Sequence, residues 1–110
     1  MALDEATVDN GCMWFVPGQA DQVVRKHRPV AEGVHILMTD DVREGEGRPV
    51  PLRAGSCTFH HGRTLHHTKG NSTETHRRAY IANFRPQAMV EQERSLGFDH
   101  GKGVGVFFIP

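Results

Sequence analysis

Residues 10–18 read Asn-Gly-Cys-Met-Trp-Phe-Val-Pro-Gly, and this stretch decides the fold class. Its middle, residues 12–16, is a run of mostly aromatic and other apolar side chains, which favour a strand. An Asn-Gly pair precedes the run and a Pro-Gly pair follows it, and both pairs are typical of turns. The stretch predicts one short strand between two turns, with Trp14, Phe15 and Val16 in the core.

The alternation of short apolar runs with Gly or Pro breakers continues along the chain. It predicts further strands over residues 34–38, 50–52, 57–60, 64–67 and 77–84. The chain is therefore expected to be mainly β-structure.

The remaining segments predict loops and one helix. A mobile, solvated loop whose mixed charges suggest no ligand is expected over residues 40–49. In the polar loop over 69–75, Asn71 is expected to order the backbone. A short helix is predicted over 88–96, with Gly97 as its left-handed cap, whereas residues 98–110 are compatible with an added strand or a frayed end.

The composition excludes several classes of partner. The chain has 110 residues, with 13 Lys plus Arg and 13 Asp plus Glu, so its formal net charge is zero. A nucleic-acid binder normally has a basic face, and a membrane helix needs about 18 consecutive apolar residues. Nucleic acid and membrane are therefore not expected as partners. Residues 1–10 contain three acids and no basic residue, which predicts a cytoplasmic rather than a secreted protein, and Cys12 and Cys57 are expected as reduced, buried thiols.

Histidine is unusually frequent and clustered. Five of the eight histidines lie within 17 positions, at His60, His61, His66, His67 and His76. Imidazole is a common ligand of iron, zinc, copper and nickel, so the cluster suggests a metal site. Side chains alternate between the faces of a strand, however, and only one member of each adjacent pair can point inward. The spacing of a four-ligand zinc site is not present, and His27, His35 and His100 are expected to have structural or surface roles.

Several segments carry a resemblance to a known family. Residues 65–71 read Leu-His-His-Thr-Lys-Gly-Asn, and Arg77 follows His66 by eleven positions. In order and spacing, these residues resemble the C-terminal half of the phytanoyl-CoA dioxygenase family, the non-haem iron and 2-oxoglutarate oxygenases, over about residues 2–85. The resemblance extends to residues 2–7, 10–18 and 54–62.

The resemblance implies an all-β fold, a partial double-stranded β-helix (a cupin-like jelly roll) whose N-terminal half is missing. It implies a domain over residues 1–85, followed by a short helix and an unassigned tail over 86–110. His66 would be the distal histidine that binds Fe(II), and Arg77 with Thr68 would bind the far carboxylate of 2-oxoglutarate. No further catalytic side chain is assigned.

Alternation along the predicted strand 77–84 leaves the direction of Arg77 open. One set of side chains shares the face of Arg77, and the other set shares the face of Arg78. The first set is Arg77, Ala79, Ile81 and Asn83, and the second is Arg78, Tyr80, Ala82 and Phe84.

The sequence also departs from the family. The first two iron ligands of the family come from a His-x-Asp motif, but none of the eight histidines has Asp or Glu two positions later. Relatives commonly continue the Pro-Gly turn with a small hydroxyl residue and His, where this chain has Gln19 and Ala20. No family pattern is found after about Arg85. We therefore expect a C-terminal fragment or truncated form of the enzyme, inactive alone.

Two function classes remain open on the sequence. The first is part of an oxygenase that hydroxylates a small organic substrate while 2-oxoglutarate is decarboxylated to succinate. The second is a non-catalytic His-rich metal-binding module or an inactive remnant. A half-barrel exposes sheet edges, so self-association through these edges is also expected, and sedimentation as a well-folded monomer would argue against it.

Overall fold

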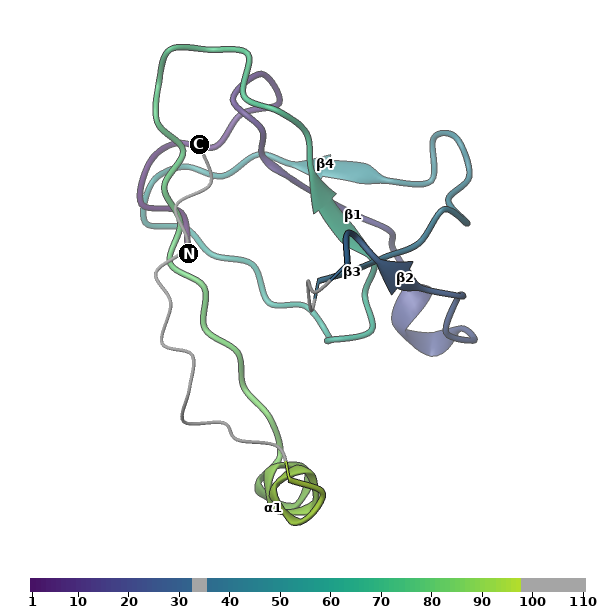
Figure 1. Cartoon of the computed structure of the whole chain (residues 1–110). Coiled ribbons are helices and arrows are strands. Elements are labelled where there is room, and N and C mark those ends of the chain that lie inside the picture. Colours follow the sequence, from purple (N-terminus) through teal and green to yellow (C-terminus); the bar gives the residue numbers. More distant parts are fainter. Residues whose placement is uncertain (33–35, 98–110) are drawn as a thin grey trace.

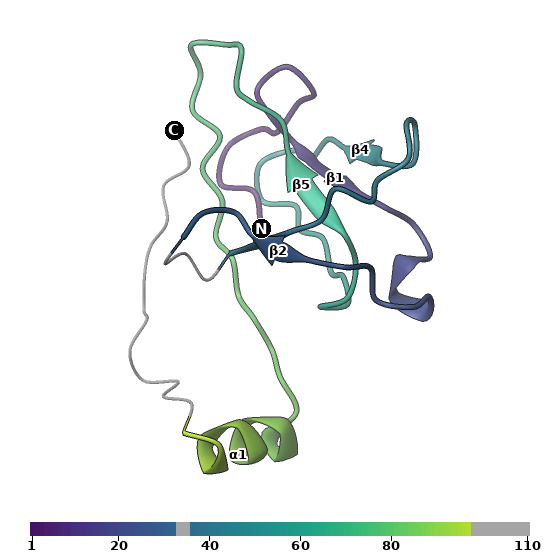
Figure 2. The same cartoon turned by 45° about the vertical axis from the view of Figure 1, so that its right-hand side comes forward.

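The computed structural model describes residues 1–32 and 36–97, and its centre is a small antiparallel sheet. This sheet, which includes β1 and β4 in Figure 1, has the strand order β4-β1-β5, and its three strands are labelled in Figure 2. Its strands are β1 (Met13–Phe15), β4 (Arg48–Val50) and β5 (His66–Thr68). The prediction of a mainly β chain is confirmed for the part that the structure describes.

A second, two-stranded sheet lies beside the first (Figure 2). It pairs β2 (Arg28–Pro29) with β3 (Leu37–Met38). Part of the predicted 34–38 strand and all of the tail 98–110 lie outside the described residues, as do His35 and His100. The strand at residues 28–29 was not predicted, because Arg28 and Pro29 have little strand preference of their own and depend on β3.

Strand β1 forms where the sequence predicts it, between two glycines in left-handed conformations. Gly11 has φ 86° and Gly18 has φ 73°, values that favour glycine because a Cβ atom strains this region. Gly18 also precedes the short 3-10 helix η1 (Gln19–Asp21). The chain therefore enters and leaves β1 by sharp turns, and β1 stays a three-residue central strand.

The N-terminal segment extends the central sheet through isolated bridges. Ala2 pairs with Ala79 and Ala6 pairs with Leu52, both antiparallel. The buried apolar residues are Ala2, Ala6, Cys12 and Val16. This core consists of small side chains. Trp14 and Phe15 were predicted to lie in the core, but both are only half-buried. Val16 is buried as predicted.

Two of the predicted strands are wrong within the described residues. Residues 57–60 form no strand, and the run 77–84 pairs through one bridge at Ala79. Their side chains have strand preference, but a strand exists only where a neighbouring chain pairs with its backbone. Phe59 and Phe84 are 88% and 86% exposed. Self-association through exposed sheet edges stays a prediction.

The loop after β3, which the sequence predicts as mobile and solvated, makes two ion pairs with residues that precede β3. Arg28 binds Asp40 at 2.7 Å, and Arg25 binds Glu46. The Arg25 guanidinium lowers the pKa of Glu46 to about 2, and the backbone N–H of Arg43 also donates to this carboxylate. Two carboxylates of this loop are therefore neutralised by arginines that precede it in the sequence.

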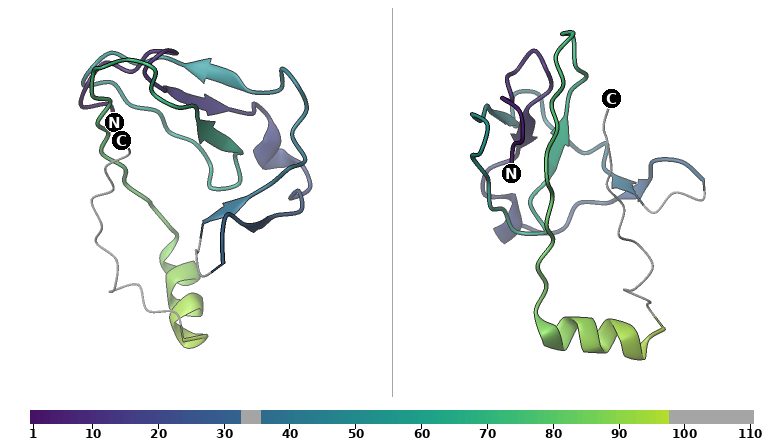
Figure 3. Two further views of the ribbon diagram at one scale, coloured as in Figure 1. Left: turned by 45° about the horizontal axis from the view of Figure 1, so that its top comes forward. Right: turned by 90° about the vertical axis from the view of Figure 1, so that its left-hand side faces the viewer.

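Helix α1 (Gln87–Ser95) lies one residue before its predicted position, and Gly97 follows it with φ 89°, as predicted. An extended segment leads to α1, which lies away from the three-stranded sheet (Figure 3). None of its residues is buried, and Arg85 binds Glu93 at 2.8 Å. Helix packing therefore contributes little to the site.

Two further expectations concern the burial of the cysteines and the presence of a membrane-spanning helix. Both cysteines are free thiols, but Cys57 is exposed, so the prediction that both are buried is wrong for Cys57. No helix in the described ranges is long and apolar enough to cross a membrane.

Gly11 gives a test of the packing between β1 and the loop after β5. A Cβ atom on Gly11 would lie 2.7 Å from the Lys69 carbonyl oxygen. We expect Gly11→Ala to lower the free energy of unfolding by about 2 kcal/mol or more, because a clash adds to the left-handed strain of about 1 kcal/mol. Gly45→Ala is the control, since Gly45 has φ 71° but no atom within 4 Å of its added Cβ. An equal decrease in the free energy of unfolding of the two variants, measured by urea denaturation, would contradict this packing role.

Candidate functional site

Strand β5 places two of the three predicted site residues on one face of the sheet. His66 pairs with Phe15 of β1, and Thr68 pairs with Met13. Side chains two positions apart on a strand share a face, so His66 and Thr68 point to the same side and His67 points to the other. The adjacent histidines at 66 and 67 are thus separated, as alternation requires.

The imidazole of His66 is oriented by one hydrogen bond and two ring contacts. Its Nδ1 lies 2.8 Å from the Thr64 carbonyl oxygen, and because a carbonyl only accepts, the proton is assigned to Nδ1. Nε2 then carries the free lone pair. The ring centre of His66 lies 4.8 Å from that of His60 and 6.0 Å from that of Phe15. Burial, and then repulsion from His66, lowers the pKa of His60.

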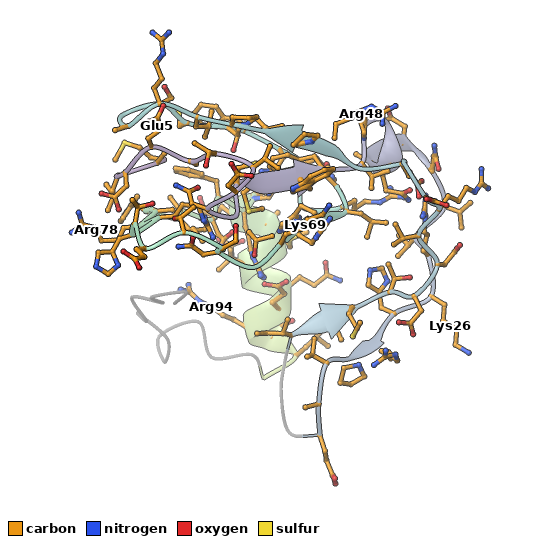
Figure 4. The ribbon with its side chains drawn as sticks, turned by 90° about the horizontal axis from the view of Figure 1, so that it is seen from above. Glu5, Lys26, Arg48, Lys69, Arg78 and Arg94 are labelled. Atoms are coloured by element: carbon orange, nitrogen blue, oxygen red, sulfur yellow. The ribbon has the colours of Figure 1, made fainter. Side chains whose placement is uncertain are left out.

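The opposite face carries a separate aromatic contact. Trp14 lies 6.0 Å from His67 between ring centres, and the Lys69 Nζ lies 3.9 Å above the Trp14 ring. This is a cation–π contact, and it holds the Lys69 ammonium at the Trp14 face of the sheet. Lys69 lies near the middle of the molecule, with Glu5 and Arg78 toward one end and Arg48 toward the other (Figure 4).

Thr68 and Arg77 line one hollow. Its volume is about 260 Å³, which is below the range of roughly 300 to 1,000 Å³ for drug-sized ligands and suits a small molecule. No acidic side chain lines it among the residues that the structure describes. Its lining is Asn10, Thr68, Lys69, Gly70, Asn71, His76 and Arg77.

The structure distinguishes the two arginines whose directions alternation left open. Arg77 lines the hollow, whereas Arg78 binds the carboxylate of Asp4 through Nε and Nη2 at 2.9 and 2.8 Å. Arg77 is half-buried and makes no hydrogen bond or ion pair within residues 1–32 and 36–97. Its guanidinium is therefore free to bind an anion, whereas the ammonium of Lys69, the other Lys or Arg of the lining, lies over the Trp14 ring.

The Asp4–Arg78 pair holds the segment that carries Arg77. Asp4 accepts from the backbone N–H of Arg78 as well as from its guanidinium. These bonds hold the pKa of the Asp4 carboxyl well below its usual range. The backbone N–H of Leu3 also donates to the Arg78 carbonyl at 2.9 Å. The N-terminal segment therefore fixes Arg78, and with it the position of the neighbouring Arg77.

Asparagines shape the rest of the hollow. Asn71 orders its loop as predicted, since its Oδ1 accepts from the Thr73 N–H and its Nδ2 donates to the Thr75 carbonyl. Asn10 is buried in the predicted turn and is hydrogen-bonded to the backbone of Glu5 and Thr7. We did not predict that Asn10 and His76 line the hollow, because residues far apart in sequence meet there without a local signal.

The histidine cluster does not gather into one metal site. Within the described residues there is no group of three or more His, Cys, Asp or Glu side chains that could hold a metal ion. For the site residues themselves, the structure brings Thr68 and Arg77 together and places His66 on the face of Thr68.

Comparison with known proteins identifies the family. The model of the family described as phytanoyl-CoA dioxygenase matches residues 1–79. The chain belongs to the phytanoyl-CoA dioxygenase family.

The relatives of this chain in the phytanoyl-CoA dioxygenase family are longer proteins. It is 29% identical to phytanoyl-CoA dioxygenase domain-containing protein 1 of Bos taurus, over 73% of this chain and 30% of that protein. It is 32% identical to the homologue of Caenorhabditis elegans, over 73% of this chain and 31% of that protein. The crystal structure of EvdO2 from Micromonospora carbonacea var. aurantiaca is similar, with a TM-score of 0.64 and 35% identity over 68% of this chain and 31% of that one. The chain spans about a third of the length of these relatives.

The Asp4–Arg78 pair predicts a pH dependence of stability. The pKa of Asp4 is lower in the folded chain than the unfolded value near 3.9, so its stabilising effect is present at neutral pH and is lost as the pH falls from about 4 toward the folded pKa. We expect Asp4→Asn to melt at a lower temperature than the wild type at pH 7, and the difference to shrink toward pH 2. The matched control is Glu5→Gln, because the Glu5 side chain makes no ion pair in the described structure. A difference that stays constant with pH would contradict this role.

Proposed function

We propose that this chain supplies the 2-oxoglutarate-binding residues and one iron ligand of an Fe(II)- and 2-oxoglutarate-dependent dioxygenase. The domain at residues 1–85 would belong to a double-stranded β-helix and carry these residues. The observation that carries the proposal is the half-buried, unpaired guanidinium of Arg77, which shares a hollow with Thr68. Family membership supports the same reaction class.

Arg77 differs from the other arginines in the described part of the chain. Its neighbour Arg78 and the half-buried Arg25 are both neutralised by carboxylates. Arg53 has no ion pair, but it is exposed to solvent. A half-buried cation without a partner favours an anionic ligand, and guanidinium matches a carboxylate through two parallel N–H donors. Arg77 would therefore bind the far carboxylate of 2-oxoglutarate.

Thr68 and His66 would act from the same strand face. The Thr68 hydroxyl would donate a further hydrogen bond to this carboxylate. His66 would bind iron through Nε2, since its Nδ1–H already donates to the Thr64 carbonyl. A second hydrogen bond of this kind usually orients a metal-binding histidine, and it supports the assignment. His27 also places Nδ1 against a carbonyl, that of Arg25, so this bond alone does not identify a ligand.

This chain would supply one protein ligand of the iron, His66. Fe(II) with 2-oxoglutarate, when bound, supplies oxidation of an unactivated C–H bond coupled to decarboxylation of 2-oxoglutarate to succinate. The His-x-Asp ligands of the family are not encoded in these 110 residues. We therefore expect no succinate from this chain alone. A small organic molecule is the proposed substrate class.

The proposal predicts which side chains bind 2-oxoglutarate. A charge-assisted hydrogen bond contributes about 1.5 to 3 kcal/mol, so Arg77→Ala should weaken binding by about 10- to 100-fold. Thr68→Ala removes a neutral donor and should weaken it by a smaller factor, about 2- to 10-fold. Arg77→Lys should lie between wild type and Arg77→Ala, because it keeps the charge but loses the second donor. Ligand-detected NMR with 2-oxoglutarate measures these affinities.

Arg53→Ala is the matched control for this experiment. It removes one positive charge at an exposed position, so it tests for a general effect of net charge. An unchanged affinity in Arg77→Ala, or an equal loss in Arg53→Ala, would contradict the proposed function.

A further inference from the structure

Arg48 lies on the same face of the central sheet as His66. In an antiparallel sheet, side chains that are directly opposite each other point to the same side. Phe15 of β1 is opposite His66 of β5 on one side and opposite Arg48 of β4 on the other. The three side chains therefore form one row across the sheet, with Phe15 between the proposed iron ligand and a cation.

The hollow proposed for 2-oxoglutarate lies next to this row but does not include Arg48. Thr68 follows His66 by two positions on β5, and it lines the hollow with Arg77. Arg48 is not part of that lining. It lies toward the end of the molecule opposite to Arg78, the neighbour of Arg77 (Figure 4). Arg48 is therefore a second cation, separate from the one proposed to bind 2-oxoglutarate.

The guanidinium of Arg48 is exposed and keeps one edge of donors free. Its Nη1 donates to the backbone carbonyl oxygens of Gly45 and Gly47. In the part of the chain that the structure describes, its Nε and Nη2 make no hydrogen bond and it has no ion pair. This edge matches a carboxylate through two parallel N–H donors. Arg78 binds the Asp4 carboxylate through the same two atoms.

The other side chains of β1 and β4 on this face are apolar. They are Met13, Phe15 and Val50, and all three are half-buried. Arg48 is the only Lys or Arg in the sequences of the three strands of this sheet. One guanidinium alone matches a singly charged carboxylate better than a phosphate group, which carries nearly two charges at pH 7. The face therefore fits an apolar molecule with one carboxylate.

We propose that Arg48 binds the carboxylate of the substrate, and that the substrate is a small apolar carboxylic acid that lies across Phe15. The inference rests on the proposed function and adds the substrate class to it. Neighbouring strands are about 4.8 Å apart, so the backbones at His66 and Arg48 are separated by about 10 Å. A small molecule spans this distance, with its carboxylate at Arg48 and its C–H bonds toward His66.

Ligand-detected NMR with hexanoate and the purified chain tests the inference. Hexanoate has a carboxylate on an apolar chain, whereas hexan-1-ol has a chain of the same length without the charge. Because Arg48 is exposed, we expect a loss at the low end for a charge-assisted hydrogen bond, about tenfold weaker hexanoate binding in Arg48→Ala. Binding of hexan-1-ol should not change. Arg48→Lys should lie between wild type and Arg48→Ala, because it keeps the charge but loses the second donor.

Two further variants separate this inference from the proposed function. Arg77→Ala should weaken 2-oxoglutarate binding and leave hexanoate binding unchanged, whereas Arg48→Ala should show the reverse. Arg53→Ala removes one positive charge at an exposed position, so it is the matched control and should affect neither ligand.

Contrary results identify which assignment is wrong. The inference is overturned if wild type does not bind hexanoate, if Arg48→Ala binds it like wild type, or if Arg53→Ala weakens it equally. Tighter binding of hexyl phosphate than of hexanoate would overturn the carboxylic acid class. Loss of hexanoate in Arg77→Ala alone would place the acid in the hollow instead. Unchanged 2-oxoglutarate affinity in Arg77→Ala would contradict the proposed function, and Arg48 would then be a carboxylate site without a substrate role.

Discussion

The site depends on the antiparallel pairing of β1 with β5. Phe15 opposite His66 and Met13 opposite Thr68 set the register, and a shift by one residue would turn His67 toward the site and His66 away from it. Gly11 lets the chain approach the Lys69 carbonyl so closely that a side chain there would clash. The turn at the start of β1 and the pairing therefore place His66 and Thr68 together.

Charge is distributed so that one half-buried guanidinium has no ion pair among the described residues. Asp4 neutralises Arg78 and anchors the extended segment, while the next residue toward the N-terminus, Arg77, faces a hollow without acidic side chains among the described residues. The two arginines are adjacent in sequence but have different neighbours and different electrostatic surroundings. One acts as a structural anchor, and the other is suited to an anionic ligand, which links the local backbone geometry to the proposed function.

The sequence predicts local features better than distant contacts. The strand at β1, the helix and its Gly97 cap follow from turn residues and apolar patterning, and those were predicted. Residues 57–60 and 77–84 have the composition of strands but find too few backbone partners, because pairing is decided by neighbours and not by preference. His66, Thr68 and Arg77 were selected by family resemblance, whereas the contact of His60 with His66 depends on how a loop returns to the sheet. Strand alternation alone could not distinguish Arg77 from Arg78; the Asp4 contact, 74 residues away, does so.

The binding role of Arg77 is tested most sharply by its side-chain NMR signal during a 2-oxoglutarate titration. With arginine labelled by ¹⁵N, we expect a saturable shift of the Arg77 Nε resonance, while that of Arg78 stays in place because its guanidinium is already bound to Asp4. A stationary Arg77 signal, or equal movement of both arginines, would show that Arg77 is not the anion-binding group.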